Sequence, residues 1–259
     1  MTPSSQQVQS SQPKAALLTG VGRREGIAAA IALALAADGW DLALVTWTPY
    51  DRRMTWGERP DDLARLVDDV EALGRRVVVL EADLSDPDVA LQLVTRAADA
   101  LGPVSGLVLS HSESVDSGIL DTTVEAFDRH YDVNVRAAWL LIKGLAEQIP
   151  ESGGRIVALT SDHVVDNMPY GSSKGALDRI VIAAARELGH LGISSNALNP
   201  GPVDTGWMSD EVRETLTAMQ PTGRLGLPGD VANIVRFLLG PEGGWVSGQL
   251  IVSNGGFNV

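Results

Sequence analysis

The chain has 259 residues, 44% of them apolar and 20% charged, with a formal net charge of −13 and no cysteine. This composition is typical of a globular protein with a sizeable core, and the acidic charge argues against a nucleic-acid-binding surface. No apolar run reaches the roughly 18 residues that span a bilayer, and the lack of cysteine excludes disulfides, thiolate metal ligands and thiol catalysis.

The first residues, 1–13, are polar and lack the apolar segment of a signal peptide. We therefore expect a disordered lead-in followed by a single domain over residues 14–259. Without an export signal, the expected location is the cytoplasm.

Short apolar runs alternate with longer helical stretches along the chain. Strands are expected at residues 15–20, 40–47, 75–84, 104–110, 154–161, 193–201 and 248–256. Helices are expected at residues 26–39, 59–74, 86–102, 122–148, 170–192 and 228–240. Continuous apolar strands, each followed by a helix, predict a doubly wound, Rossmann-like α/β domain of about seven parallel strands with helices on both faces. Ligands of such a sheet bind at the carboxyl ends of its strands.

The loop after the first strand contains Gly20, Gly22 and Gly26 and leads directly into a helix. Glycines there allow a tight turn and a close approach to a pyrophosphate, which the helix N-terminus favours. The third glycine lies one residue later than in the G-x-G-x-x-G pattern. A plain turn therefore remains the alternative to a dinucleotide loop.

The end of the second strand carries Trp47 and Thr48, where a pocket selective for NAD places an acid. Arg23 and Arg24 lie in the neighbouring glycine loop. A missing acid and nearby guanidinium groups favour the 2′-phosphate of NADP(H) over NAD(H). The alternative is that these arginines are solvated loop residues.

The segment "LTSDHVVDNMPYGSSK" contains two candidate sets of catalytic residues. Contiguous Ser161, Asp162 and His163 could suggest a hydrolase, but neighbouring side chains of a strand end point in alternate directions. The sequence around Ser161 also lacks the Gly-x-Ser-x-Gly pattern, and the four histidines have no metal-ligand spacing. Tyr170 and Lys174 share a helix face, where an ammonium group near a phenol would lower the phenol pKa.

At this point the chain resembles the short-chain dehydrogenase/reductase family, in its 3-oxoacyl-ACP-reductase-like branch, from about Lys14 to Phe257. The resemblance rests on "TGVGRREGIA", "EADLSD", "DVNVRA", "VALTS", "YGSSK" and "NPGPVDT", which occur in the family's order. It implies cofactor contacts at the following residues: Gly20, Gly22, Arg23, Arg24, Gly26, Ile27, Trp47, Asp83, Leu84, Ser110, Tyr170, Lys174, Pro200, Gly201, Val203 and Thr205.

The resemblance also implies an NADP(H)-dependent oxidoreductase acting on a small-molecule carbonyl or alcohol. Tyr170 would protonate the carbonyl oxygen, Lys174 would hold the nicotinamide ribose and Ser161 would orient the carbonyl. Asn134 would position a water for proton relay. A homo-oligomer, either a dimer or a tetramer, is expected through the long helices and the last strand.

The chain departs from the family pattern at several positions. Ser161 and Tyr170 are only nine residues apart, Arg24 replaces the middle glycine, and "SHSE" at residues 110–113 replaces Asn-Asn-Ala-Gly. The "GIA" of the glycine loop resembles the enoyl-reductase branch, although that branch spaces its Tyr and Lys more widely. An enoyl-reductase-like enzyme and a cofactor-binding sensor or scaffold without turnover are therefore the alternatives.

The segment after the sixth strand, residues 204–230, is expected to form a lid. Trp207, Met208, Leu216 and Met219 could line an apolar substrate wall or pack in a subunit interface. The sequence does not decide between these two roles.

Overall fold

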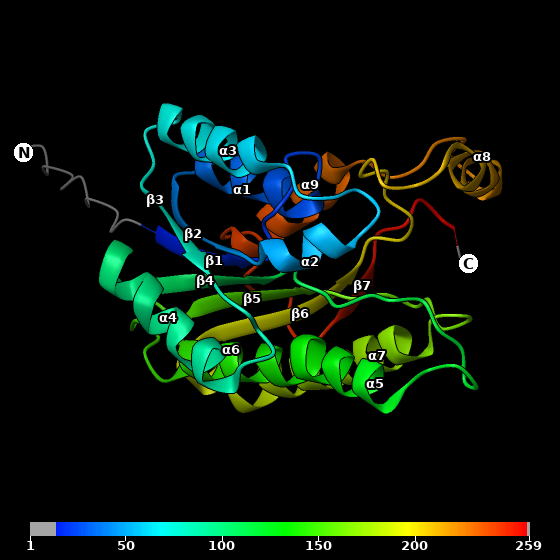
Figure 1. Ribbon diagram of the computed structural model, residues 1–259. Helices are drawn as coiled ribbons and strands as arrows, with labels where there is room; N and C mark the ends of the chain where they lie inside the picture. The colour runs from blue at the N-terminus through cyan, green and yellow to red at the C-terminus, as the bar shows by residue number, and fades with distance from the viewer. Residues whose placement is uncertain (1–13, 258–259) are drawn as a thin grey trace, which may run out of the picture.

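Seven parallel strands form one sheet in the order β3-β2-β1-β4-β5-β6-β7 in the computed structural model, which describes residues 14–257 (Figure 1). The strands are β1 (Lys14–Thr19), β2 (Trp40–Thr46), β3 (Val77–Glu81), β4 (Val104–Leu109), β5 (Gly154–Leu159), β6 (Ile193–Asn199) and β7 (Leu250–Val252). The predicted doubly wound fold is confirmed. The expected lead-in at residues 1–13 lies outside the described residues.

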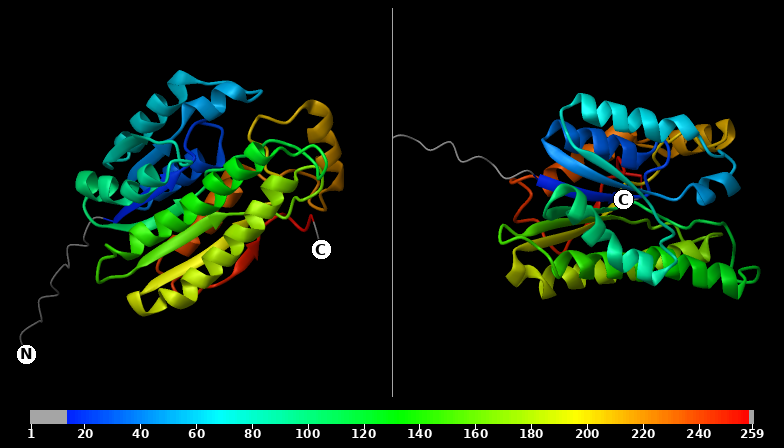
Figure 2. Two further views of the ribbon diagram at one scale, coloured as in Figure 1. Left: turned by 60° about the horizontal axis from the view of Figure 1, so that its bottom comes forward. Right: turned by 60° about the vertical axis from the view of Figure 1, so that its left-hand side comes forward.

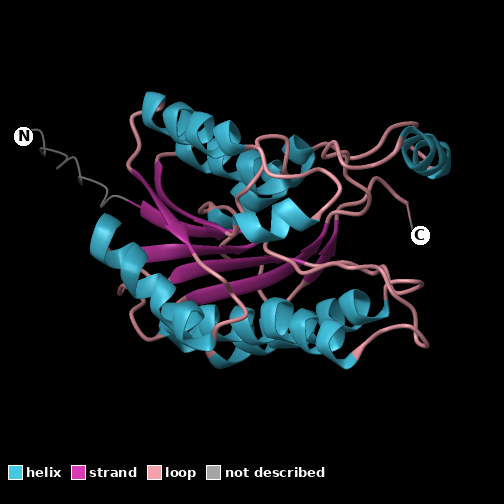
Figure 3. Ribbon diagram, in the orientation of Figure 1, coloured by secondary structure: helices cyan, strands magenta, loops and turns pink. Residues whose placement is uncertain are grey.

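Helices cover both faces of the sheet, as Figure 3 shows by the two helical layers around the strands. One layer contains α1 (Ile27–Ala37), α3 (Pro60–Ala72) and α9 (Pro228–Leu239). The other contains α4 (Pro87–Leu101), α5 (Val124–Tyr131), α6 (Ala137–Ala146) and α7 (Met168–Glu187). The views in Figure 2 place these two layers on opposite sides of the sheet.

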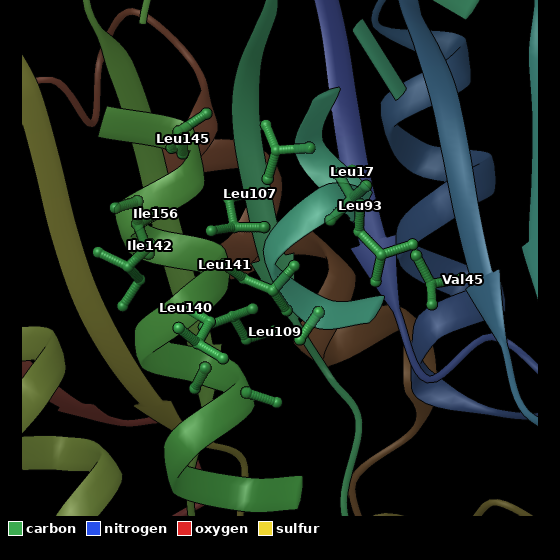
Figure 4. Close-up of a cluster of buried hydrophobic side chains, with 14 of the residues drawn as sticks. Leu17, Val45, Leu93, Leu107, Leu109, Leu140, Leu141, Ile142, Leu145 and Ile156 are labelled. Atoms are coloured by element: carbon green, nitrogen blue, oxygen red, sulfur yellow. The ribbon is translucent and has the colours of Figure 1, made fainter. Parts of the chain in front are cut away.

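The two faces of the sheet have separate apolar cores, because consecutive strand residues point to opposite faces. Leu17 of β1 packs with Leu107 and Leu141 beneath α4 and α6, as Figure 4 shows. Leu18, its neighbour, packs with α1 and α9 on the other face. Each such leucine is fully buried and contributes about 1.5–3 kcal/mol of transfer free energy to folding.

Several helices begin at residues that the sequence provides for that purpose. The carboxylate of Asp86 accepts hydrogen bonds from the first N–H groups of α4, and the hydroxyl of Thr123 accepts from the N–H of Ala126 in α5. A proline occupies the first turn of α3, α4, α7 and α9, where its missing N–H costs nothing. These caps fix where each strand-to-helix loop ends.

The structure differs from the expected elements in four places. The expected helical region at 122–148 is helical without a break from Val124 to Ala146, but a π-helical turn, η1 (Asp132–Arg136), lies between α5 and α6. The expected helix at 170–192 begins earlier, at Met168, and a short 3-10 turn, η2 (Gly189–Leu191), follows its end. Two helices were not expected: α2 (Thr48–Arg53) and, within the predicted lid, α8 (Asp210–Met219). Both lie beyond the carboxyl ends of the strands (Figure 1).

Candidate active site

A cavity opens at the carboxyl ends of β1, β2 and β4, at the position where doubly wound sheets bind ligands. Ten of the residues predicted to contact a cofactor line it: Gly20, Gly22, Arg23, Gly26, Ile27, Trp47, Asp83, Leu84, Ser110 and Thr205. The cavity lining does not include Arg24, Tyr170, Lys174, Pro200, Gly201 or Val203. The structure therefore gathers the predicted cofactor residues of the first half of the chain, except Arg24, together with Thr205 around one space.

The glycine loop presents bare backbone to this cavity. Gly20 has a φ of +75°, and a Cβ there would lie 2.7 Å from the backbone N of His111 and from the carbonyl O of Ser110. A Cβ on Gly22 would lie 2.5 Å from Oδ2 of Asp51. Gly26 is the N-cap of α1 and has no side chain to cover the helix N-terminus. A bare loop leading into an open helix N-terminus fits the pyrophosphate of a dinucleotide.

Arg23 and Arg24, neighbours in the same loop, point to different places. The guanidinium of Arg23 lines the cavity, donates to the carbonyl O of Thr205 at 2.8 Å and stacks 4.6 Å from the ring centroid of Trp56. Arg24 forms an ion pair with Asp69 of α3 at 2.5 Å instead. The structure thus leaves Arg23 as the predicted arginine that can meet a phosphate group in the cavity.

Three cavity residues were missed by sequence reasoning because they belong to α2 or follow it. Tyr50 and Asp51 lie on α2, and Nε1 of Trp56 donates to Oδ1 of Asp51 at 2.8 Å. The "TPYDRRMTW" stretch follows the second strand, so its place at the mouth of the site could have been inferred from the topology alone. Its helical conformation could not, since α2 buries none of its residues.

The altered segment after β4 places a carboxylate in the wall of the cavity. Glu113 is only 2% exposed, and its carboxylate pairs with Arg53 of α2 and, at 3.2 Å, with Nε of Arg129 of α5. Two guanidinium groups beside one carboxylate satisfy the buried charge. Glu113 therefore joins α2 to α5 across the cavity wall, a role that no motif in the sequence indicates.

His111 of the same segment is a neutral structural residue. Its Nδ1 lies 2.7 Å from Oγ1 of Thr19, and its Nε2 lies 2.9 Å from the carbonyl O of Val133. Because Nε2 faces a carbonyl, it carries the proton, and Nδ1 accepts from the threonine hydroxyl. Burial lowers the pKa of His111 to about 3, so the imidazole stays uncharged at neutral pH.

The predicted catalytic residues meet beside the N-terminal end of α7. Tyr170 and Lys174 lie one turn apart on this helix, with the Lys174 Nζ 5.6 Å from the centroid of the Tyr170 ring. The Lys174 ammonium also donates to the carbonyl O of Leu159 at the end of β5, at 2.9 Å. A hydrogen bond joins the side chains of Ser161 and Tyr170, so the nine-residue separation does not keep them apart.

The expectation that Lys174 lowers the phenol pKa needs correction. Burial raises the pKa of Tyr170, and the hydrogen bond with Ser161 is what opposes this rise. Burial also lowers the pKa of Lys174, to about 8. Desolvation is the largest cause of both pKa shifts, so Tyr170 is a protonated phenol at neutral pH, the form that a general acid requires.

Asn134 lies in the π-helical turn η1, and hydrogen bonds occupy its amide group. Its Oδ1 accepts from the N–H of Glu113 at 2.7 Å, and its Nδ2 donates to the carbonyl O of Glu113 and to Oγ of Ser173, both at 2.9 Å. Asn134 thereby ties the segment after β4 to α7. The changed "SHSE" segment keeps this connection because it uses backbone atoms.

The Ser161, Asp162 and His163 sequence does not have the geometry of a hydrolase. His163 contributes its backbone N–H, which donates to Oγ of Ser161 at 3.1 Å, while its side chain is exposed. Ser161 is thus turned toward Tyr170, and its chemistry belongs to the tyrosine–lysine pair.

The remaining cofactor candidates lie in the loop after β6. Gly201 has a φ of +63° and packs against Asn254, and Val203 is buried with the core beside α9. In this segment Thr205 alone lines the cavity. Within residues 14–257, no helix is long and apolar enough to cross a membrane, and no cluster of acidic and histidine side chains could bind a metal ion.

Comparison with known proteins agrees with this geometry. A family model described as enoyl-(acyl carrier protein) reductase matches residues 20–258. A short-chain dehydrogenase/reductase from Armillaria gallica is 34% identical, over 95% of this chain and 96% of that protein. The chain belongs to the short-chain dehydrogenase/reductase family. Members of this family are NAD(P)-dependent oxidoreductases.

Other relatives are similar along nearly their whole length. An NADPH-dependent aldehyde reductase-like chloroplastic protein from Arabidopsis thaliana is 33% identical, over 94% of each chain. A short-chain dehydrogenase from Burkholderia cenocepacia, solved in complex with NADP, superposes with a TM-score of 0.85 at 33% identity, over 96% of this chain and 99% of that chain. A blue fluorescent protein from a metagenomic library, solved with NADPH, also has a TM-score of 0.85, at 32% identity over 95% and 98% of the chains.

Proposed function

We propose that this protein is an NADP(H)-dependent carbonyl reductase, which interconverts a small-molecule carbonyl compound and its alcohol. The observation that carries the proposal is the grouping of Tyr170, Ser161 and Lys174 at the end of β5. The neighbouring cavity has a bare glycine loop, an open helix N-terminus and a guanidinium group, which together fit a dinucleotide phosphate.

When bound, the nicotinamide cofactor supplies the hydride that reduces the carbonyl carbon. The hydroxyl of Tyr170 donates its proton to the carbonyl oxygen, and burial keeps that phenol protonated until then. The hydroxyl of Ser161 holds the same oxygen in place. The ammonium of Lys174, anchored on Leu159, lies beside the ring of Tyr170 and stabilises the phenolate that forms.

Asn134 acts as a positioning residue in this proposal. Its amide bonds both the Glu113 backbone and Ser173, one turn from Tyr170, and so connects the wall of the cofactor cavity to the catalytic helix. The predicted relay through a water would use the second lone pair of Asn134 Oδ1.

The preference for NADP(H) is supported by Arg23 in the cavity and by the absence of an acid at Trp47. The relatives that are NADPH-dependent or solved with NADP(H) point the same way. The position of Asp51 favours NAD(H) instead, because its carboxylate lines the same cavity and would repel a 2′-phosphate.

Fluorescence titration with NADPH and NADH, on the wild type and Tyr170→Phe, tests the proposal. We expect both proteins to bind NADPH at least about tenfold more tightly than NADH. Tyr170→Phe should lower carbonyl reduction by roughly 10²- to 10⁴-fold, the usual contribution of a general acid. Failure of the wild type to bind either nucleotide would contradict the proposal.

Two alternative functions have specific support. The matching family model is described as an enoyl reductase, which would reduce a carbon–carbon double bond, whereas the Tyr170–Lys174 spacing favours the carbonyl-reducing, 3-oxoacyl-ACP-reductase-like branch. The altered segment at residues 110–113 and the short loop between Ser161 and Tyr170 are the features that favour a sensor that binds NADPH without turnover. Parallel assays with ketone and enoyl thioester substrates, followed at the NADPH absorbance, separate all three functions.

We further propose a homo-oligomer in the cytoplasm. Trp139 of α6 and Leu250 and Val252 of β7 are about half exposed, and Trp245 is 98% exposed. Large apolar side chains on the long helices and on the last strand are expected to be covered by other copies of the chain. Light scattering of the purified protein measures the number of copies.

A further inference from the structure

The segment that follows β2, residues 47–57, contains α2 and lies at the cofactor cavity without packing into the core. None of these residues is buried. Near its end, Gly57 has a φ of +66°, and a Cβ added there would meet no atom within 4 Å. A short element without a buried face has low local stability, so it can open while the rest of the protein stays folded.

This segment covers part of the glycine loop. Tyr50, Asp51 and Trp56 line the same cavity as the loop. The Asp51 carboxylate lies against Gly22, where an added Cβ would be 2.5 Å from its Oδ2. A nucleotide phosphate placed on this part of the loop would meet the carboxylate. The ligand of the proposed function therefore cannot reach the loop here unless α2 moves outward.

An ion pair joins α2 to the segment after β4. The guanidinium of Arg53 pairs with the carboxylate of Glu113, which is only 2% exposed. Arg129 of α5 also contacts this carboxylate, at 3.2 Å, so the buried charge stays paired when α2 moves away. The Arg53 side chain is 39% exposed, so water can solvate it in the same event. This ion pair can therefore break and re-form without leaving a bare charge inside the protein.

The neighbouring arginine has a partner of a different kind. Arg52 pairs with Glu58, which lies only six residues later, with 3.2 Å between Nη2 and Oε1. This contact stays within one stretch of chain and does not tie α2 to another element. The two adjacent arginines thus separate an ion pair that holds the helix over the cavity from one that is local.

We propose that α2 is a lid over the cofactor cavity, and that Arg53 and Glu113 are positioning residues that latch it. The lid opens to admit the nucleotide and latches again once it is bound, with the Asp51 side chain turned away from the loop. The latch thereby slows both entry and release. Only the identity of the admitted ligand rests on the proposed function.

Hydrogen exchange of residues 47–57, followed by mass spectrometry, measures lid opening without any nucleotide. In Arg53→Gln these amides should exchange roughly tenfold faster than in the wild type, because a charge-assisted hydrogen bond is lost. Arg52→Gln is the matched control and should stay within about twofold of the wild type. Arg53→Lys, which keeps the charge, should retain most of the protection.

Glu113→Gln breaks the same latch from the other side and provides a second variant should Arg53→Gln fail to fold. The amides of α2 should exchange faster in it by a similar factor. Equal exchange in Arg53→Gln and Arg52→Gln would overturn the proposal, whether or not the protein binds a nucleotide.

Binding kinetics give a second readout. In Arg53→Gln, stopped-flow mixing with NADPH should show association and dissociation both faster by roughly three- to tenfold, with Kd changed less than about threefold. Slower association with weaker binding would mean that Arg53 contacts the nucleotide directly, and would overturn the latch. Faster exchange in a protein that binds no nucleotide would support the latch and refute the proposed function, so the two failures are distinguishable.

Discussion

Arg23 and Arg24 are adjacent in the chain but contact different parts of the molecule. Arg23 lies between Trp56 and the carbonyl of Thr205 in the cavity, while Arg24 is bonded to α3 through Asp69. The sequence alone predicts the same role for both arginines. Their side-chain directions differ because of the turn between them, which the sequence does not specify. The distinction required the three-dimensional structure.

The two arginines form a matched pair of variants. We expect Arg23→Gln to weaken NADPH binding by roughly 10- to 100-fold, because a charge-assisted hydrogen bond contributes about 1.5–3 kcal/mol, and to affect NADH little. Arg24→Gln should leave both affinities within about twofold. Isothermal titration of each variant with both nucleotides measures this, and equal losses in the two variants would contradict the assignment.

His111 shows how a buried neutral group can link stability to pH. Its folded-state pKa of about 3 lies below the ordinary value of 6.5, so the unfolded chain binds the proton first as pH falls. Its contribution is complete above pH 6.5 and is lost progressively toward pH 3.

Replacement of this histidine by glutamine tests the linkage, since Gln can accept from Thr19 and donate to Val133 but cannot titrate. Between pH 7 and 4.5 the wild type should lose about 2–3 kcal/mol more unfolding free energy than His111→Gln. Urea unfolding at the two pH values provides the measurement. Parallel losses in both proteins would show that His111 does not carry this linkage.

At the scale of elements, the first strand-to-helix loop is held against the loop after β4. Gly20 and Gly74 both have a φ near +75°, but only at Gly20 would a Cβ meet backbone atoms, those of Ser110 and His111. Substitution of Gly74 therefore tests the cost of the positive φ alone, whereas substitution of Gly20 adds the cost of the close backbone approach.

We expect Gly74→Ala to cost about 1–2 kcal/mol of stability, the cost of a left-handed backbone for a residue with a side chain. Gly20→Ala should cost a further 1–3 kcal/mol or so, because two loops must move apart. Chemical denaturation gives both values. An equal cost at the two positions would mean that the loops can separate freely.

The long elements were predictable from the sequence and the short ones were not. Continuous apolar runs such as β2 and the Ala-rich α1 have one interpretation in a doubly wound fold, and the structure follows it. α2 and α8 have only six and ten residues and bury none of them, so neither belongs to the alternation of buried strands and covering helices that the sequence predicts. The π-helical turn at Asn134 depends on one extra residue in a continuous apolar pattern, which a sequence cannot locate.

The candidate site divides in the same way. Tyr170, Lys174 and Ser161 could be named from the shared helix face of the first two and from the resemblance to the family, and the structure brings them together. The topology alone places the stretch with Asp51 and Trp56 near the mouth of the site, but it does not show that their side chains line the cavity, and no motif marks Glu113.

At the scale of the whole molecule, two segments far apart in the sequence meet beside the cavity. Trp56, after α2, lies 6.5 Å from Trp207, after β6, measured between ring centroids. Arg23 joins the same place by its bond to Thr205. These two contacts therefore connect the loops after β1 and β2, in one half of the sheet, to the loop after β6, in the other half, at the mouth of the site.

Removal of Trp207 tests this bridge. Because an aromatic pair contributes about 0.5–1.5 kcal/mol, NADPH should leave Trp207→Ala roughly two- to tenfold faster than the wild type. Phe237→Ala, which removes a half-exposed aromatic side chain of α9 outside the cavity lining, is the control. Stopped-flow displacement of bound NADPH measures the dissociation rates, and equal rates in the two variants would exclude the bridge as a barrier.

The Trp56–Trp207 bridge also has a consequence for the timing of the catalytic cycle. For the proposed dinucleotide, we expect release from the cavity to require the two tryptophans beside Thr205 to move apart, whereas a small product would not need this movement. Oxidised cofactor would then be the last species to leave, and its departure would set the rate at saturation. If the contact between the two tryptophans delays cofactor release, we expect the first turnover to be faster than all later ones, which would appear as a burst of product.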